Sequence, residues 1–299
     1  MYRTILLPLD GSALAERAVP YASTLAQASG ARLLLLQATH IEMRPGRDPA
    51  QQQAHALHAA RDYLAGVAAQ LDRRILVETV VFPAGATEAI RQETQVRTVD
   101  LIVMTPHSHP GPGRGLYGRV ATATVRRAEV PVLLIPTVGE GTWPHGRRLR
   151  LLVPLDGCDC IGAVLRYADD LAAVLHAEVL LLKVEASSRV AEASASTPPR
   201  VPGRRSRAAL EAIVTGARSD EQTMSRHGGA DHADTTLATI APTQGADMVA
   251  LPMHTCGSVP YHESDRALAE LLQHAGLPLL LVGSTTAWGA ARPTAEAGA

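Results

Sequence analysis

Short apolar runs alternate with amphipathic stretches along the first half of the chain. The apolar runs are rich in Leu, Val and Ile, which is typical of strands that are covered on both faces of a sheet. The stretches between them carry apolar residues at helical spacing. The predicted strands are Thr4–Leu9, Arg32–Ala38, Ile75–Phe82, Leu101–Met104 and Pro131–Ile135, and the predicted helices are Ala13–Ala28, Asp48–Leu71, Thr87–Arg97 and Val120–Ala128. This alternation predicts an α/β fold, with a parallel sheet and helices on both of its faces.

The same pattern occurs twice. The run ILLPLDGS at residues 5–12 returns as LLVPLDGC at residues 151–158. The equivalent pairs, 146 or 147 positions apart, are Asp10 with Asp156, Tyr21 with Tyr167, and Asp100 with Asp247. A repeat of this length indicates a duplicated domain, because each copy is long enough to bury a core of its own.

The repeat divides the chain into two predicted domains. The first spans 1–137, a Gly- and Pro-containing linker spans 138–148, the second domain spans 149–284, and a tail of small residues spans 285–299. The second domain carries an insert at about 187–207, rich in Ala, Ser, Pro and Arg, which we expect to be mobile. A helix is expected at Ala208–Arg218, and a weak third strand at Thr223–Gly229.

Composition and charge exclude several classes of protein. Hydrophobic residues make up 46% of the chain and the net charge is −1, so neither a disordered chain nor one that binds nucleic acid is expected. The apolar segments are too short to span a membrane and no secretory signal precedes the first strand, so a cytoplasmic protein without membrane contact is expected. Three cysteines do not make a disulfide framework.

A family resemblance follows from these motifs. The Pro-Leu-Asp-Gly-Ser end of the first strand, the strand IVM that opens a glycine-bearing loop, and the closing VPVLLIP together resemble the universal stress protein (UspA-like) family, in a tandem two-domain form. The resemblance implies two doubly wound, Rossmann-like domains of the adenine-nucleotide alpha-hydrolase type. It implies a five-stranded parallel sheet in the order 3-2-1-4-5 in each domain. It also implies an internal pseudo-dimer through the fifth strands, with Val132–Ile135 beside Leu279–Val282.

The resemblance also points to a nucleotide site in the first domain. ATP-binding members carry a loop after the fourth strand with glycine, two residues, glycine, nine residues, then glycine and serine or threonine. The equivalent positions here are Thr105, Ser108, Gly118 and Arg119, so one of the four conforms. Gly111, Gly113 and Arg114 in the same loop offer a second way to hold a phosphate, because glycine N–H groups and a guanidinium both bind anions. The cofactor implied is ATP with Mg²⁺, bound weakly or not at all.

The second domain departs further from the family's loop. Its equivalent positions are Pro252, Thr255, Asp265 and Arg266, and Asp265 adds a carboxylate that repels phosphate. Asp10 and Asp156 match the aspartate that meets the nucleoside in this family, and Ala38 lies near the position that touches the base. An aspartate after a first strand is also a common turn former or N-cap, and both roles remain open.

Cysteine and histidine side chains are predicted at the same edge of the second domain. Cys158 and Cys160 follow its first strand, and His254 and Cys256 follow its fourth. Three thiolates and an imidazole are a set that binds zinc, although buried or incidental cysteines explain the same residues. The pair His107 and His254 lies 147 positions apart, so that histidine also belongs to the repeat.

Three functions therefore remain from sequence alone. The first is a stress-response or regulatory protein that acts through its paired domains and through contacts with protein partners, with a homodimer as one arrangement. The second is an adenine-nucleotide-binding stress protein that uses the first domain. The third is a metal or thiol redox module in the second domain. No catalytic residue is assigned, because no nucleophile–His–acid order, metalloprotease helix or Walker loop is present; at most, slow ATP hydrolysis is expected.

Overall fold

The computed structural model describes residues 2–39, 48–106, 118–155, 161–183, 200–202, 237–238, 240–253, 268 and 271–283. The predictions for Ala208–Arg218, Thr223–Gly229 and 285–299 lie outside these residues. Among the described residues, no helix is long and apolar enough to cross a membrane.

Strands and helices alternate along residues 2–136, as the pattern predicts. The elements are β1 (Thr4–Leu9), α1 (Ala13–Glu16), α2 (Val19–Ser29), β2 (Arg32–Ala38), α3 (Pro49–Gln70), β3 (Val77–Phe82), α4 (Ala86–Val96), β4 (Leu101–Met104), α5 (Arg119–Arg127) and β5 (Val132–Leu134). The single helix predicted over Ala13–Ala28 is wrong, because α1 ends at Glu16 and α2 begins at Val19. Pro20 explains the break, since its ring lacks an N–H and clashes with the carbonyl four residues earlier.

The second half contains fewer described elements. They are β6 (Arg150–Leu155), α6 (Ile161–Leu175), β7 (Glu178–Lys183), β8 (Arg200–Pro202), β9 (Met248–Met253), the short π-helix η2 (Leu271–Ala275) and β10 (Leu279–Gly283).

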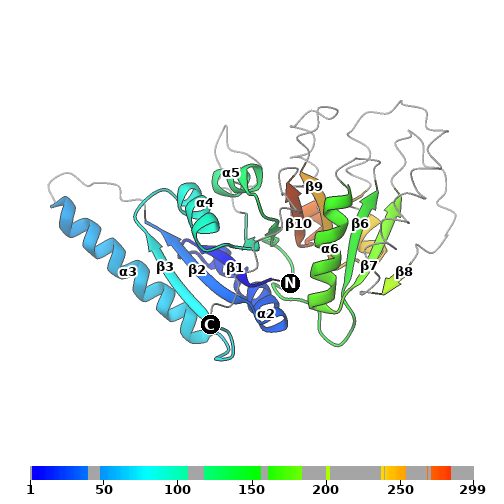
Figure 1. Cartoon of the computed structure of the whole chain (residues 1–299), viewed down its shortest axis with the longest axis horizontal. Helices are drawn as coiled ribbons and strands as arrows, with labels where there is room; N and C mark the ends of the chain where they lie inside the picture. Colours follow the sequence, from blue (N-terminus) through cyan, green and yellow to red (C-terminus); the bar gives the residue numbers. More distant parts are fainter. Residues whose placement is uncertain are drawn as a thin grey trace, which may run out of the picture.

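All the strands among the described residues form one sheet, which runs through both halves (Figure 1). The sheet has ten strands in the order β3-β2-β1-β4-β5-β10-β9-β6-β7-β8. Within each half the long strands are parallel, so the predicted α/β fold with a parallel sheet is confirmed. The halves meet where β5 and β10 pair antiparallel, with Leu134 opposite Leu279 and Val132 opposite Leu281.

The third strand of the second half differs from the prediction. The strand β8 lies within the segment expected to be a mobile insert, and it pairs antiparallel with β7, with Val179 opposite Val201. The predicted five-stranded parallel sheet of the second half is therefore wrong at this edge. The strand β8 begins 17 residues after β7 ends, and strands that pair antiparallel need no crossover connection between them. Pro202 is tolerated there because an edge strand has one unpaired side.

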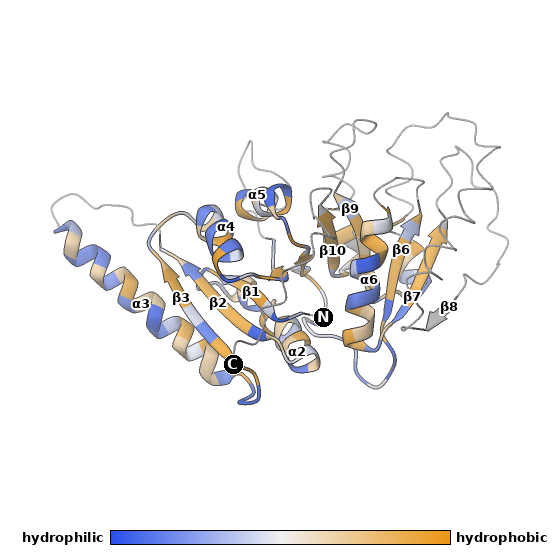
Figure 2. Ribbon diagram, in the orientation of Figure 1, coloured by the Kyte–Doolittle hydropathy of each residue, from blue (hydrophilic) through white to orange (hydrophobic). Residues whose placement is uncertain are grey.

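Two apolar cores lie on opposite faces of the sheet, and each contains residues from both halves. Alternate residues of a strand point to opposite faces, so Leu7 belongs to the core beneath α2, α3 and α6 and Leu6 to the core beneath α4 and α5. The first core continues across the junction through Leu133 and Leu280, and the second through Leu134 and Leu279. Figure 2 shows the apolar strands between helices whose outer sides are polar.

The pair Asp100 and Asp247 explains one of the repeated positions. The Asp100 carboxylate accepts the backbone N–H groups of Arg3 (2.7 Å) and Thr4 (3.0 Å), where β1 begins. The Asp247 carboxylate accepts the N–H of Arg150 (2.8 Å), where β6 begins, and pairs with the Arg147 guanidinium. Each aspartate precedes one strand and anchors the start of its neighbour, a structural role that both halves share.

The segment between the halves is packed against the first half. Arg17 donates from Nε to the carbonyl of Pro136 (3.2 Å) and from one terminal nitrogen to those of Val138 (3.0 Å) and Gly139 (2.8 Å). The Trp143 ring is 3% exposed and meets Tyr21 edge to face, with the ring centroids 4.8 Å apart. The segment predicted as a linker therefore packs against the first half at the junction.

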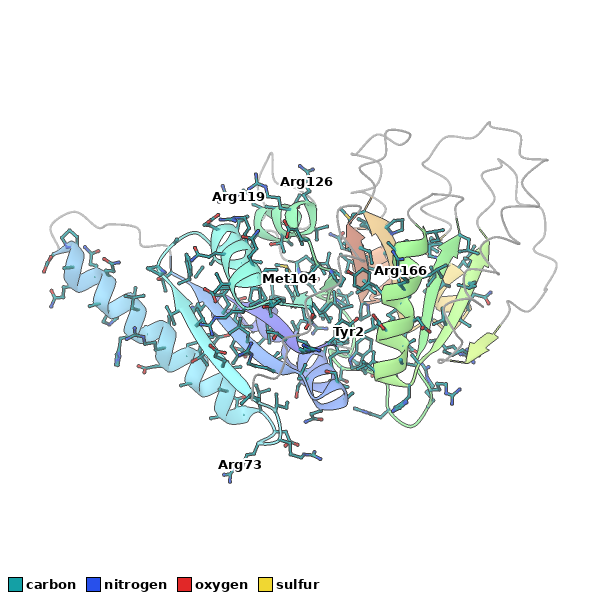
Figure 3. All side chains as sticks on the ribbon, in the orientation of Figure 1. Tyr2, Arg73, Met104, Arg119, Arg126 and Arg166 are labelled. Carbon is teal, nitrogen blue, oxygen red and sulfur yellow. The ribbon has the colours of Figure 1, made fainter. Side chains whose placement is uncertain are left out.

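The first described residue also lies at the junction. Tyr2 is buried between the halves and lies beside α6 in Figure 3. Burial raises the pKa of its hydroxyl, and Asp170 and Tyr167 of α6 raise the pKa further. The helices α2 and α6, one from each half, contact each other on the same face.

Candidate functional site

The predicted site begins with the turn that follows β1. Gly11 has a φ of +83°, which reverses the chain directly after Asp10. The Asp10 Oδ1 atom accepts from the Ser12 N–H (3.0 Å) and from the Ser12 hydroxyl (2.6 Å). The Ser12 Oγ accepts in turn from the Ala15 N–H (3.1 Å), so Ser12 is the N-cap of α1. Asp10 thus forms the turn while its exposed carboxylate stays at the carboxyl edge of the sheet.

Two other predicted residues lie at the ends of the neighbouring strands. Ala38 is the last residue of β2, and Thr105 directly follows β4 and is buried. The strands β2, β1 and β4 are adjacent and parallel, so Asp10, Ala38 and Thr105 share one edge of the sheet. Ligands of open α/β sheets bind beyond this edge.

The start of α5 supplies the fourth part of the site. Gly118 precedes the helix with a φ of +80°, a conformation that favours glycine, and no side chain of the described residues is found to cap the first turn. The first N–H groups of a helix have no partner within it, and together with the helix dipole they favour an anion. Arg119 is the first residue of α5 and is exposed; Figure 3 shows Arg119 and Arg126 on this helix.

The other predicted site residues lie outside the described residues. In the first half these are Ser108, Gly111, Gly113 and Arg114, and in the second half Asp156, Thr255 and Arg266. The four residues of the predicted metal set, Cys158, Cys160, His254 and Cys256, also lie outside. Within the part of the chain that the structure describes, no group of three or more His, Cys, Asp or Glu side chains is arranged to hold a metal ion.

Two polar residues near this turn, Gln37 and Tyr63, were not singled out from the sequence. A Cβ placed on Gly11 would lie 3.8 Å from Nε2 of Gln37, the residue before Ala38. Burial raises the pKa of the Tyr63 hydroxyl, and the nearby carboxylates of Glu16 and Asp10 raise the pKa further. Tyr63 lies on the buried side of α3 with Ala60, Leu64 and Val67. Its hydroxyl group was the only sign in the sequence that this side chain reaches the carboxyl edge of the sheet.

One small cavity lies elsewhere. It has a volume of about 30 Å³ and lies between α4 and α5, lined by apolar groups of Ile90 and Ile102 and by Thr94, Thr124 and Arg127. None of the predicted site residues lines it. The candidate site is the carboxyl edge of the sheet around Asp10 together with the start of α5.

Comparison with known proteins relates both the sequence and the fold to one family. The model of the universal stress protein family matches residues 1–136. A universal stress protein of Thermus aquaticus is 32% identical to this chain over 136 residues, which are 45% of this chain and 99% of that protein. The crystal structure of a universal stress protein from Archaeoglobus fulgidus has a TM-score of 0.61 at 17% identity and covers 94% of this chain and 96% of its own.

A second solved structure has the same extent. A protein from Pseudomonas aeruginosa, described as a universal stress protein, has a TM-score of 0.58 at 16% identity and covers 94% of this chain and 93% of its own. At these identities the likeness concerns the fold, and it includes both halves of the chain.

Proposed function

The chain belongs to the universal stress protein family, as the sequence motifs indicated, and on that premise we propose that it is a tandem member whose two halves act as one regulatory unit. In this proposal one polypeptide supplies both partners of a pair. Its role in the stress response then depends on contacts that the paired unit makes with other molecules.

The observation that carries this proposal is the shared junction. The antiparallel pairing of β5 with β10 joins the halves into one sheet, and both apolar cores continue across that line. Arg17 and Trp143 hold the connecting segment against the first half. A junction of this kind favours one unit over two domains tethered by a flexible linker.

The proposal is tested in cells that lack this chain, with two matched leucine variants. Leu280 of β10 lies at the junction and Leu64 of α3 lies far from it, and both are fully buried. Replacing either with alanine costs about 2–5 kcal/mol of stability. We expect Leu64→Ala to retain part of the chain's ability to restore survival under stress, and Leu280→Ala to lose it at matched protein abundance. Equal survival with the two variants would contradict a role for the paired unit.

A second function, weak binding of an adenine nucleotide by the first half, is favoured by the start of α5. We propose that Gly118 and the uncapped first turn of α5 receive phosphate, with Arg119 as a cation beside it. Asp10 and Ala38 then face the nucleoside, in keeping with their common edge. Thr105 stands where ATP-binding members of the family have glycine, which is the reason to expect weak affinity. Bound Mg²⁺ would neutralise part of the phosphate charge.

The nucleotide proposal is tested by thermal unfolding with and without Mg-ATP. A ligand at ten times its Kd stabilises the native state by about 1.4 kcal/mol. We expect stabilisation of this size at several millimolar Mg-ATP, and its loss in Arg119→Gln. The matched control is Arg126→Gln, which changes an exposed arginine at the other end of the same helix and should retain the stabilisation. An unchanged transition in the wild type at ten millimolar Mg-ATP would refute weak binding in this range.

The third function, a metal or thiol redox module, depends on Cys158, Cys160, Cys256 and His254. These residues lie outside the described part of the chain, so no geometry favours it over the other two. It remains a prediction from sequence. Metal analysis of protein purified without chelator is its test.

A further inference from the structure

The strand β3 forms one outer edge of the ten-stranded sheet. It pairs with β2 through six consecutive residues, Val77 to Phe82, without a bulge. No other described strand lies on its outer side. A regular edge strand carries a row of unpaired backbone groups, which can template the pairing of another strand.

The backbone register identifies which groups face outward. The Leu33 N–H donates to the carbonyl of Leu76, and the Thr39 N–H donates to the carbonyl of Phe82. Because the backbone groups of a strand alternate in direction, even-numbered residues of β3 face β2. The N–H and C=O groups of Val77, Thr79 and Val81 therefore point away from the sheet.

The sequence of β3 itself lacks several of the features that usually protect an edge strand. It contains neither proline nor lysine, and the only charged residue, Glu78, is occupied by ion pairs with Arg32 (3.2 Å) and Arg97. Thr79 is exposed even though α3 packs on the same face, so the helix leaves the middle of the edge open. Leu76, just before the strand, is 68% exposed.

The sequence of β3 is complementary to itself in the antiparallel direction. When the pairing is centred on Thr79, all three outward-facing residues pair with the second strand. Thr79 then lies opposite its own copy, and Val77 lies opposite Val81. The same register sets exposed Leu76 opposite Phe82 and Glu78 opposite Val80, so no charge faces a like charge. Apolar pairs of this kind stabilise antiparallel strands.

We propose that β3 is a pairing surface for a second copy of this chain, with the two β3 strands antiparallel about a twofold axis at Thr79. The contact is isologous, so it closes at two chains and leaves no free β3 edge. It extends the sheet in the same way as the pairing of β5 with β10 does within the chain. The alanine-rich α3 helices, with Ala65, Gly66 and Ala69 exposed, then lie side by side and can approach closely because their side chains are small.

A proline at the centre of the edge separates this proposal from a general loss of folding. The Thr79 N–H faces outward, so Thr79→Pro removes no hydrogen bond to β2 but blocks pairing with a second strand. Thr79→Val is the matched control, because it keeps the N–H and suits a strand. Circular dichroism checks that both variants retain the fold.

The readout is the mass in solution, measured by light scattering after size exclusion at concentrations from micromolar to several hundred micromolar. We expect the wild type and Thr79→Val to reach twice the 31.6 kDa of one chain, and Thr79→Pro to stay at 31.6 kDa. A wild type that stays at one chain's mass throughout would overturn the proposal. A doubled mass in Thr79→Pro would also overturn it, because the chains would then pair through another surface.

Cysteine cross-linking tests the register itself. In a background with Cys158, Cys160 and Cys256 replaced by serine, Thr79→Cys places two thiols at the twofold axis, within the separation that a disulfide requires. We expect Thr79→Cys to form a disulfide-linked dimer on oxidation, and Val81→Cys to form none, because its two copies are several residues apart. Cross-linking of Val81→Cys alone would overturn the register and with it the proposed axis.

Discussion

Replacing Arg17 with alanine tests how strongly the connecting segment is held to the first half. The variant removes three hydrogen bonds from one guanidinium to the carbonyls of Pro136, Val138 and Gly139. A buried hydrogen bond from a charged donor contributes about 1.5–3 kcal/mol. Arg17 is only half-buried and two of the three bonds are exposed, so we expect about 0.5–1 kcal/mol for each. The whole variant should therefore lose about 2 kcal/mol.

The assay is equilibrium unfolding in urea, followed by tryptophan fluorescence in a Trp288→Phe background, so that the buried Trp143 reports alone. The matched control is Arg73→Ala, an exposed arginine in the turn before β3 that projects away from the body of the molecule in Figure 3. We expect the control to change the free energy of unfolding by less than about 0.5 kcal/mol. A loss in Arg17→Ala no larger than that of the control would refute the role of Arg17 in fixing the junction.

Three further predictions concern individual side chains. The Asp247 side chain is 4% exposed and pairs with Arg147, so Asp247→Asn should cost roughly 3 kcal/mol in urea unfolding. A cost below about 1 kcal/mol would contradict the contribution of this ion pair. Among the described residues the buried Thr124 hydroxyl has no hydrogen-bond partner, whereas the Thr94 hydroxyl donates to the Ile90 carbonyl (2.6 Å). Thr124→Val should therefore gain up to about 1 kcal/mol of stability, and Thr94→Val should lose about 1 kcal/mol. Burial, and then the charge of Asp170, raises the pKa of Asp169, so the ionised carboxylate destabilises the fold at neutral pH. Asp169→Asn should therefore be more stable than the wild type at pH 7. This gain should disappear as the pH falls below about 4, the ordinary pKa of an aspartate. A gain that grows toward low pH would show that the direction is wrong.

Most of the first half could be predicted from its apolar runs. A strand covered on both faces needs a continuous apolar run, and β1, β2 and β4 have little else. The break at Pro20 was missed because apolar residues keep helical spacing on both sides of it. The antiparallel β8 was not predictable because Arg200–Pro202 carries neither an apolar run nor a turn motif, and its place depends on the free edge of β7.

The candidate site was predicted through residues that follow strands. Asp10, Ala38 and Thr105 come together because strands that are neighbours in the sheet end at one edge, and that order is implied by the family pattern. Arg17 and Tyr63 could not be found in this way. Their partners are backbone carbonyls of the connecting segment and the groups around Gly11, and no spacing in the sequence records such contacts.

Scanning calorimetry of the wild type and of Leu64→Ala tests most directly whether the two halves are one unit. Leu64 is a fully buried residue of the first half, so its loss destabilises that half by about 2–5 kcal/mol. If the halves are one unit, the wild type unfolds in a single transition whose calorimetric and van't Hoff enthalpies agree, and Leu64→Ala moves that whole transition to lower temperature. Two transitions, with only one of them moved by Leu64→Ala, would contradict the account.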